Sequence, residues 1–281
     1  MHKLTMKNGF GHSNSIKLLA LAAVSIVVAG SFFALSVRAE GVRVVVKGDD
    51  AQGWYSGDTS DGGAVSYYGD STSPYPSGVL ALTTNDTPGA KAQYLKEVNV
   101  PLAQVTDLSY YTKQVAGPAG AAVSYQLNIE LHGIVDWTTA FVFDPSANGQ
   151  VVAGEWQKWD VYNGQFWANN SVHPIVVAGN GGSPYYTLNE LKAAYPNANV
   201  RSFGVYAGTF DPAYNVGTSK QNLNLEVDGV TFNSSMYDFE VAIPEPTTAT
   251  SKDQCKNGGW MSFQGAYTNQ GQCVSSIVSN N

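Results

Sequence analysis

Aromatic and amide side chains gather in the middle third of the 281-residue sequence. Flat aromatic rings can lie against the apolar faces of sugar rings, while Asn, Gln, Asp and Glu can hydrogen-bond sugar hydroxyl groups. We therefore predict ligand contacts for Trp137, Trp159, Trp167, Tyr185 and Tyr186. For each of these side chains, a place in the core or as a loop anchor is the alternative.

Paired carboxylates would suit a glycosidase, which needs two of them roughly 5 to 10 Å apart in one cleft. Glu226 and Asp228 lie two positions apart in a predicted strand and so share a face, and Glu130 is a further candidate. The E-x-D-x-x-E run that marks sandwich-fold endoglucanases is absent from the sequence. We therefore prefer a solvated or metal-binding face, and keep hydrolysis as a minority hypothesis.

Oxygen-rich side chains also suggest a structural calcium ion, because this hard cation takes carboxylate and carbonyl oxygens as ligands. Asp58 and Asp61 lie in the turn-forming stretch GDTSDGG at residues 57–63, and Asp228 is a third candidate ligand. The stretch lacks the full spacing of an EF-hand loop. A plain polar turn is the alternative.

Composition excludes several other chemistries. Beyond residue 39 the only histidines are His132 and His173, far apart, so a His/Cys zinc site is not expected. The sequence has no nucleophile elbow, no P-loop and no dinucleotide-binding glycine motif after a strand. Residues 40–281 carry eleven basic against 22 acidic residues, a net charge of −11 that repels phosphate backbones. We expect neither a nucleic-acid partner nor binding of this part to anionic lipid.

The elements that position these residues are predicted to be strands. Charged residues make up 13% of the sequence and hydrophobic residues 43%, while 29 glycines and 16 tyrosines favour strands and turns over long helices. Within residues 122–131, the apolar residues at odd positions from Val123 to Leu131 alternate with the polar residues at even positions from Ser124 to Glu130. One face of this strand should therefore lie on a core, and the other should meet water or a ligand. Similar runs predict about ten strands, at residues 41–47, 79–83, 94–100, 105–112, 122–131, 138–143, 156–162, 175–178, 200–207 and 222–232.

One short helix is predicted, because Thr187 and Glu190 form a capping box before the apolar positions Leu188, Leu191 and Ala194. No strands alternate with helices as in a parallel sheet. The fold class is therefore all-β: an antiparallel β-sandwich of the jelly-roll type over residues 40–240.

The N-terminal residues 1–39 predict export. Residues 16–37 are almost wholly apolar and follow Lys3 and Lys7, and Val37-Arg38-Ala39 places small residues at cleavage-type positions. We favour a signal peptide removed after Ala39. An uncleaved hydrophobic helix acting as an anchor is the alternative, and it would be the only contact with a membrane. Either outcome predicts a secreted or cell-surface location.

The C-terminal residues predict a linker and a small disulfide-closed tail. Residues 241–251 are rich in Pro and Thr and form the linker, and residues 252–281 form the tail. The only two cysteines, Cys255 and Cys273, are expected to pair because the chain is predicted to be exported. Closing a loop of about 18 residues contributes roughly 3 kcal/mol in the chain-entropy model.

Three parts of the sequence resemble known proteins. The tail, SKDQCKNGGWMSFQGAYTNQGQCVS, resembles a C-K-x-G-G-W … N-Q-G-x-C-V-S motif that recurs in exported bacterial proteins with different bodies. The body resembles galactose-binding-like and carbohydrate-binding-module-like jelly rolls, on GEWQKWD at 154–160 and LNLEVDGVT at 223–231. This resemblance implies sugar binding and, often, a structural calcium ion. VAIPEP at 241–246 resembles the Pro-Glu-Pro boundary of bacterial surface-sorting tails, but no hydrophobic helix or basic stop follows it.

Together these features predict a non-catalytic binding module whose partners are carbohydrate or cell-surface components. A structural or adhesive surface protein that packs against its neighbours is the alternative from another class. A glycoside hydrolase that uses Glu130 or Glu226 with Asp228 is a weaker third hypothesis.

Overall fold

The computed structural model describes residues 41–75, 77–131, 138–209, 220–242, 248–263 and 266–279. The predictions for the leader at 1–39, for its hydrophobic helix and for Trp137 lie outside these ranges, as do residues 243–247 of the predicted linker. Among the helices in these ranges, none combines the length and the apolar composition needed to cross a bilayer.

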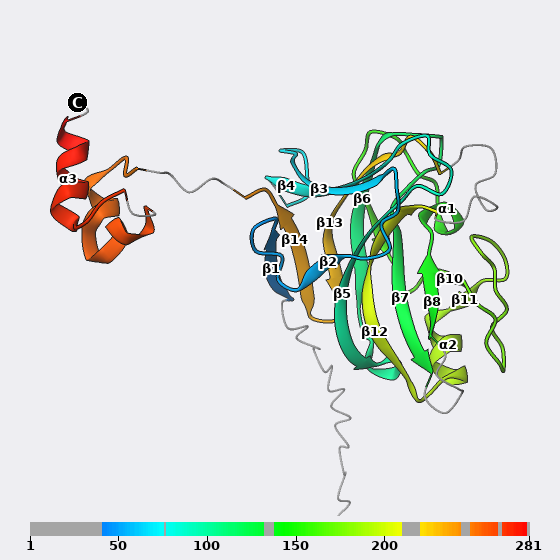
Figure 1. The fold of residues 1–281 in the computed structure, drawn as a ribbon. Coiled ribbons are helices and arrows are strands. Elements are labelled where there is room, and N and C mark those ends of the chain that lie inside the picture. Colours follow the sequence, from blue (N-terminus) through cyan, green and yellow to red (C-terminus); the bar gives the residue numbers. More distant parts are fainter. Residues whose placement is uncertain are drawn as a thin grey trace, which may run out of the picture. The chain divides into compact units, whose positions relative to one another are not determined.

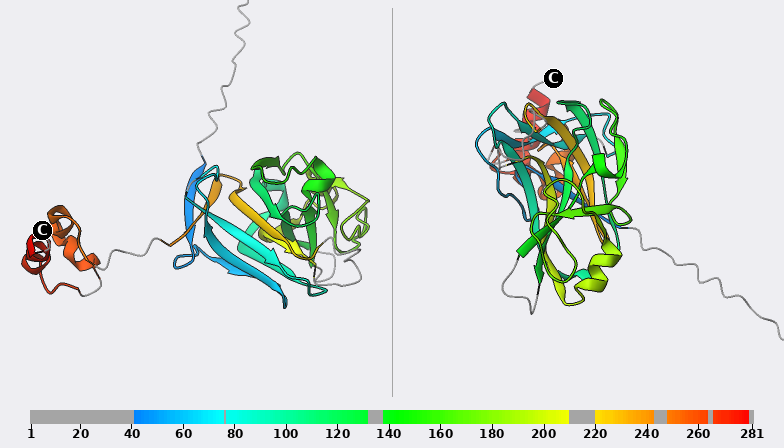
Figure 2. Two further views of the ribbon diagram at one scale, coloured as in Figure 1. Left: turned by 90° about the horizontal axis from the view of Figure 1, so that it is seen from above. Right: turned by 90° about the vertical axis from the view of Figure 1, so that its right-hand side faces the viewer.

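Fourteen strands of the described chain form two sheets that face each other across a common core (Figures 1 and 2). The first sheet contains β1 (Val42–Lys47), β14 (Ser235–Glu240), β13 (Asn224–Phe232), β4 (Gly78–Thr84), β3 (Gly63–Gly69), β6 (Leu108–Ala116) and β9 (Gln157–Asp160). The second sheet runs in the order β11 (Tyr186–Thr187), β10 (Gln165–Ala168), β8 (Thr138–Phe143), β7 (Ser124–Leu131), β12 (Ala198–Gly208), β5 (Lys91–Pro101) and β2 (Trp54–Ser56). All pairs are antiparallel except β1 with β14.

The predicted all-β sandwich is confirmed, and nine of the ten predicted strands are present. The sequence patterns missed β2, β3, β10, β11 and β14. Three of these are four residues or shorter, too short for a clear alternating run, whereas in β14 Tyr237 and Phe239 do alternate with Asp238 and Glu240. Their place in the sheets is set by pairing with neighbouring strands.

The apolar run at 175–178, predicted as a strand, forms only an isolated bridge between Val172 and Val176. Its backbone groups are satisfied by this bridge and by side-chain hydroxyls, not by a strand ladder. The Val177 N–H donates to the Tyr186 hydroxyl at 2.9 Å, and the Val176 N–H donates to the Tyr195 hydroxyl at 3.2 Å. A backbone N–H needs a hydrogen-bond partner but not one from a ladder, and these local hydrogen bonds replace the predicted strand.

The core explains why the sequence contains so many aromatic residues. The Trp54 ring stacks on Tyr94 with centroids 5.6 Å apart, and it meets the edges of Phe203, Tyr237 and Phe239 at 5.2 to 5.3 Å. Trp54, Tyr94 and Phe203 come from the second sheet, whereas Tyr237 and Phe239 come from the first. Much of the aromatic content therefore joins the two sheets, since offset and edge contacts add to the free energy gained from burial.

The predicted helix is confirmed as α2 (Leu188–Ala194), with both hydrogen bonds of the capping box between Thr187 and Glu190. Four further helical segments of the described chain were not predicted: η1 (Leu102–Gln104), the single turn α1 (Pro145–Asn148), and the two helices of the tail. In α1 the Asp144 side chain accepts from the Ser146 N–H at 3.1 Å and Pro145 occupies the first turn, which are ordinary signals for a helix start.

The described part of the predicted tail, together with residues 248–251 of the predicted linker, has its own small core. It contains η4 (Lys252–Ser262) and α3 (Gln270–Ser279), joined by the predicted disulfide between Cys255 and Cys273, whose Cα atoms lie 5.7 Å apart. Buried around the disulfide are Ala249, Phe263 and Tyr267, with Trp260, Val274 and Ile277 packed against them. So few apolar side chains cannot hold so short a segment without a covalent link.

Replacing both cysteines by serine is therefore expected to unfold the tail while leaving the sandwich intact, because the loop contributes about 3 kcal/mol that this small core cannot replace. Limited proteolysis followed by mass spectrometry checks this. New cleavage sites are expected within residues 248–279, with no change in the thermal midpoint of the sandwich. A tail that stays protected in the double variant would contradict the prediction.

Candidate functional site

The two faces of β7 divide as the alternating pattern predicts. Tyr125, Leu127 and Ile129 are fully buried in the core. Gln126 and Asn128 point to the opposite face and line a cleft. Side chains alternate between the two faces along the neighbouring strands as well, and the outer face presents polar residues such as Lys91 and Gln93 on β5 and apolar residues such as Ala140 and Val142 on β8.

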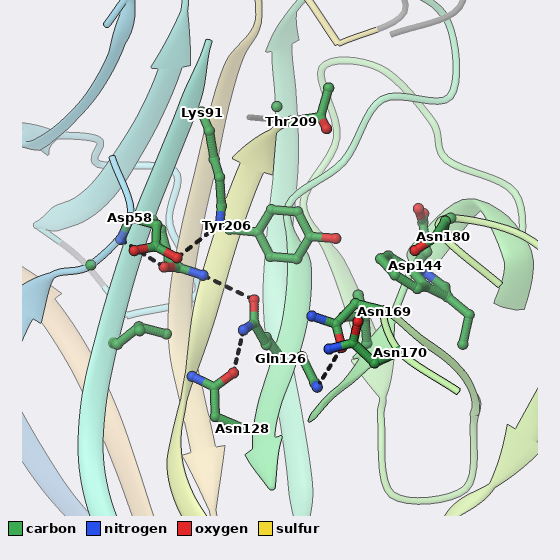
Figure 3. A pocket seen from close by; sticks show the side chains of 18 of the residues that line it. Asp58, Lys91, Gln126, Asn128, Asp144, Asn169, Asn170, Asn180, Tyr206 and Thr209 are labelled. Carbon is green, nitrogen blue, oxygen red and sulfur yellow. Dashed lines mark hydrogen bonds and ion pairs between the residues drawn. The ribbon is translucent and has the colours of Figure 1, made fainter. Parts of the chain in front are cut away.

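This cleft has a volume of about 1120 Å³ and extends over six strands of the second sheet, from β2 to β10. Figure 3 shows Tyr206 between a group formed by Asp58 and Lys91 and a group formed by Asp144, Asn169, Asn170 and Asn180, with Gln126 and Asn128 nearby. The residues that line it are Tyr55, Gly57, Asp58, Lys91, Gln93, Leu95, Gln126, Asn128, Ala140, Val142, Asp144, Trp167, Asn169, Asn170, Ser171, Ala178, Asn180, Gly181, Tyr206, Gly208, Thr209 and Lys220.

Charges in the cleft are balanced. The Lys91 side chain is only 7% exposed, lies over the Tyr206 ring at 5.5 Å and has its Nζ 3.9 Å from Oδ2 of Asp58. Burial lowers the pKa of Lys91, and the nearby Asp58 carboxylate opposes that shift. Lys220 Nζ likewise lies 3.9 Å from Oδ2 of Asp144. Both separations exceed a hydrogen bond, so a hydroxyl group that donates to the carboxylate and accepts from the amine fits either pair.

One part of the cleft is apolar. Trp167, Ala140 and Val142 form a small cluster on the outer face of the second sheet, apart from the main core, and Tyr185 and Tyr206 pack against it. The small side chains of Ala140 and Val142 lie beside the Trp167 ring because β8 and β10 are paired at Val142. The cleft therefore combines an apolar floor, formed by Trp167, Ala140 and Val142, with a polar floor that includes Gln126 and Asn128. Ligand sites usually combine the two kinds of surface.

Comparison with known proteins finds similarity only among solved structures: no protein-family model and no curated protein sequence matches the chain. A family 11 carbohydrate-binding module of a Clostridium thermocellum cellulosomal cellulase is similar, with a TM-score of 0.35 and 12% identity, over 69% of this chain and 90% of that one.

Two larger enzymes are similar over part of their length. An arabinose-bound GH51 α-L-arabinofuranosidase has a TM-score of 0.36 and 8% identity over 69% of this chain and 25% of its own. A CBM22-1–GH10 xylanase fragment from Clostridium thermocellum, complexed with xylohexaose, has a TM-score of 0.32 and 11% identity over 64% of this chain and 26% of its own. This chain thus spans about a quarter of each enzyme chain.

The aromatic residues predicted to bind a ligand lie in different places. Trp167 lines the cleft, and Tyr185 packs against the Trp167 cluster. Tyr186 on β11 is tied to the segment at 175–178, since its hydroxyl donates to the Ile175 carbonyl at 3.1 Å. Trp159 is in the main core, 7% exposed, with its indole N–H donating to the Thr112 hydroxyl at 2.8 Å. Trp137 is outside the described residues.

The three aspartates predicted as calcium ligands are not brought together. Asp58 lines the cleft on the second sheet, and Asp61 lies in the following turn. Asp228 is on β13 of the first sheet, fully buried, where it accepts from the Ser73 hydroxyl and from the N–H groups of Gly229 and Phe239. In the part of the chain that the structure describes, no three His, Cys, Asp or Glu residues form a group that could hold a metal ion. Calcium stays a sequence-based prediction.

The carboxylates considered for hydrolysis lie outside the cleft. Glu226 is 4% exposed on the first sheet, 3.2 Å from Lys113 Nζ, which also binds Asp70 at 2.7 Å. Burial raises the pKa of Glu226, although Lys113 opposes the shift. Glu130 pairs with Arg201 at 2.8 Å. Glu226 and Asp228 share a strand as predicted, but both are covered by protein.

Sequence reasoning missed Lys91 and Gln93 of the cleft's polar floor, and it did not name Gln126 and Asn128 as site residues, although their strand face was expected to meet water or a ligand. A sequence signal for Gln126 and Asn128 was present, because both occupy polar positions of the strand that alternates most clearly. Lys91 and Gln93 were missed because the strand was predicted at 94–100, whereas β5 begins at Lys91 and places both residues on the sheet.

Proposed function

We propose that this protein binds a carbohydrate chain in the cleft on the outer face of the second sheet, without hydrolysing it. The observation that supports this is the pairing of an apolar floor at Trp167 and Val142 with a floor of amide side chains at Gln126 and Asn128. A sugar ring has the same two properties, C–H faces and hydroxyl groups that both donate and accept. The balanced charge of the lining favours such a ligand over one that carries a strong charge of either sign.

Absence of hydrolysis is proposed because the carboxylates on the first sheet are covered, while a glycosidase needs two that face the scissile bond. The two carboxylates among the described lining residues, Asp58 and Asp144, each lie beside a lysine. Such pairs suit recognition of hydroxyl groups. A binding module with this ligand would act outside the cell, which agrees with the export predicted for residues 1–39.

Trp167 on β10 of the second sheet and Trp156, which immediately precedes β9 of the first sheet, provide a matched test. Trp167→Ala is expected to weaken binding to a soluble polysaccharide at least about tenfold, or ~1.4 kcal/mol, because it removes the aromatic wall of the apolar floor. Trp156→Ala, which removes a half-buried ring beside Lys113 on the first sheet, should leave affinity unchanged. Tyr206→Ala is a second cleft variant in case Trp167→Ala is poorly folded.

The measurement is affinity electrophoresis or calorimetry against a panel of neutral glucans, xylans and mannans, each with CaCl2 and with EDTA, with circular dichroism to verify folding. If the wild-type protein binds no member of the panel in either condition, the proposed function is rejected. Concentration-dependent self-assembly of the same sample would then favour the structural role. Release of reducing ends from a bound polysaccharide would reject the non-catalytic part.

A further inference from the structure

A chain of hydrogen-bonded amides crosses the polar floor of the cleft. The Gln93 side-chain amide on β5 donates to Oε1 of Gln126 on β7 at 2.9 Å. Gln126 in turn donates from Nε2 to Oδ1 of Asn128, and Asn128 donates from Nδ2 to the Ser202 hydroxyl on β12 at 2.7 Å. Figure 3 shows the links that join Gln126 and Asn128. The chain thus ties three strands together on their outer face.

The chain depends on a glycine in the strand between its first two members. β12 separates β5 from β7, and Gly204 is the residue of β12 that pairs with Leu95 on one side and with Gln126 on the other. Because Gly204 has no side chain, none stands between Gln93 and Gln126, and their side chains meet across the intervening strand. The Gln93–Gln126 hydrogen bond thus joins two strands that are not neighbours in the sheet.

The direction of the chain is set at its start by a backbone group. The Asp58 N–H, which can only donate, lies 2.9 Å from Oε1 of Gln93. Gln93 must therefore turn its oxygen toward Asp58 and its NH2 toward Gln126, and the same constraint passes to Gln126 and Asn128. An amide oxygen and an amide nitrogen have nearly the same shape, so only hydrogen-bond partners decide which way each amide faces.

Gln126 is the middle amide of the chain, so it passes the order that Asp58 sets at Gln93 on to Asn128. It is about nine-tenths buried, whereas Asn128 is half-buried and reaches the cleft. Asn128 keeps one N–H and part of its acceptor capacity outside the chain, since an amide has two N–H bonds and two lone pairs. Which of these faces the ligand depends on the order imposed by Gln126.

We propose that Gln126 is a positioning residue: it fixes the orientation of the Asn128 amide and so decides where the cleft offers a donor and where it offers an acceptor to a ligand hydroxyl. This proposal rests on the proposed function. It predicts that reversing the amide order weakens binding even when no contact with the ligand is removed and the packing volume is conserved.

Gln126→Glu tests the order with an almost isosteric change. Above the pKa of the introduced carboxyl group, the carboxylate still accepts from Gln93 but has no hydrogen to donate to Asn128. The Asn128 amide is then expected to turn over, donating to the carboxylate and accepting from the Ser202 hydroxyl. When the carboxyl group is protonated at lower pH, its O–H donates to Asn128 again and the original order returns.

The expected result is therefore a pH-dependent loss. The ratio of the dissociation constants of Gln126→Glu and the wild type should be about ten or more at pH 8 and should approach one at pH 4.5. Lys91, Asp58, Asp144, Lys220 and Tyr206 also face this cleft, but they are common to both proteins, so their titration cancels to first order in the ratio. Gln126→Leu, which cannot hydrogen-bond, should bind weakly at both pH values.

Gln157→Glu is the matched control, because Gln157 on β9 of the first sheet also accepts from one group and donates to another, at Val152 and Gln150. The ratio of the dissociation constants of Gln157→Glu and the wild type should stay near one at both pH 8 and pH 4.5. A folded Gln126→Glu protein that binds like the wild type at pH 8, or whose ratio does not change with pH, would overturn the proposal while leaving the proposed function standing.

An NMR measurement without ligand tests the positioning role of Gln126 separately from the proposed carbohydrate binding. In a 1H–15N spectrum, the side-chain NH2 signals of Asn128 should move with pH in Gln126→Glu and stay in place in Gln126→Leu. If they do not move in the folded variant, Gln126 does not control Asn128, whatever the protein binds. If they move but the wild type binds no polysaccharide, the positioning role holds and the proposed function fails.

Discussion

Gly204→Ala is expected to destabilise the sandwich by about 3 kcal/mol or more, because β12 and β5 approach each other too closely for any side chain at this position. A Cβ atom added to Gly204 would lie 2.1 Å from the Tyr94 carbonyl oxygen and 2.8 Å from the Leu95 Cα. Both atoms belong to the backbone, so no side-chain rotation relieves the overlap. The two strands would have to separate along the register that pairs Gly204 with Leu95.

The measurement is the thermal midpoint by calorimetry, where a loss of this size corresponds to a fall of roughly 6 to 12 °C for a domain of this length. Gly69→Ala is the matched control, since its added Cβ would meet nothing closer than the Ser77 carbonyl oxygen at 3.8 Å, an ordinary contact. We expect the control to stay within about 0.5 kcal/mol of the wild type. A Gly204→Ala protein as stable as this control would show that the strands separate at little cost.

The contrast between β7 and β12 shows how much of the fold the sequence predicts. Alternation in residues 122–131 identified both the buried face and the face that lines the cleft, because a strand with one face on a core must repeat with period two. The need for glycine at position 204 comes from a carbonyl on a strand about a hundred residues away in the chain. No local pattern reports a contact of that kind.

The same distinction applies to the candidate site. Trp167 could be named from its residue type, but Trp159, equally suited by type, lies in the core because β9 pairs with β6 in the first sheet. Gln93 and Gln126 form one polar floor only because the strand between them carries Gly204. Residue types thus predicted the kind of chemistry, while strand order decided which residues supply it.

Asp228→Asn is expected to remove most of a fall in stability that the wild-type protein shows between pH 4 and pH 7. Burial raises the pKa of Asp228 from 3.8 to about 7, with the nearby Asp238 carboxylate adding to the rise and the donors Ser73, Phe239 and Gly229 opposing it. Between these two values the folded protein holds a proton at Asp228 that the unfolded chain releases. The free energy of unfolding therefore decreases as pH rises through this window.

The size of this effect follows from the shift. A difference of about three pH units corresponds to about 4 kcal/mol, fully present below pH 4 and lost above pH 7. Asp70 has the opposite sign, because hydrogen bonds from Lys113 and Thr72 lower its pKa, so its contribution is lost only in more acidic solution. Burial also raises the pKa values of Asp238 and Glu226. These two groups therefore keep part of the pH dependence of the free energy of unfolding in Asp228→Asn.

Chemical denaturation at several pH values from 4 to 8 measures the slope directly. An asparagine at position 228 can still accept from the Phe239 and Gly229 N–H groups and can donate to the Ser73 hydroxyl, so the local hydrogen bonds survive without a buried charge. Asp58→Asn, at a side chain that is 85% exposed, should follow the wild-type curve. Parallel curves for Asp228→Asn and the wild type would show that Asp228 carries the same charge in the folded and unfolded chains across this range.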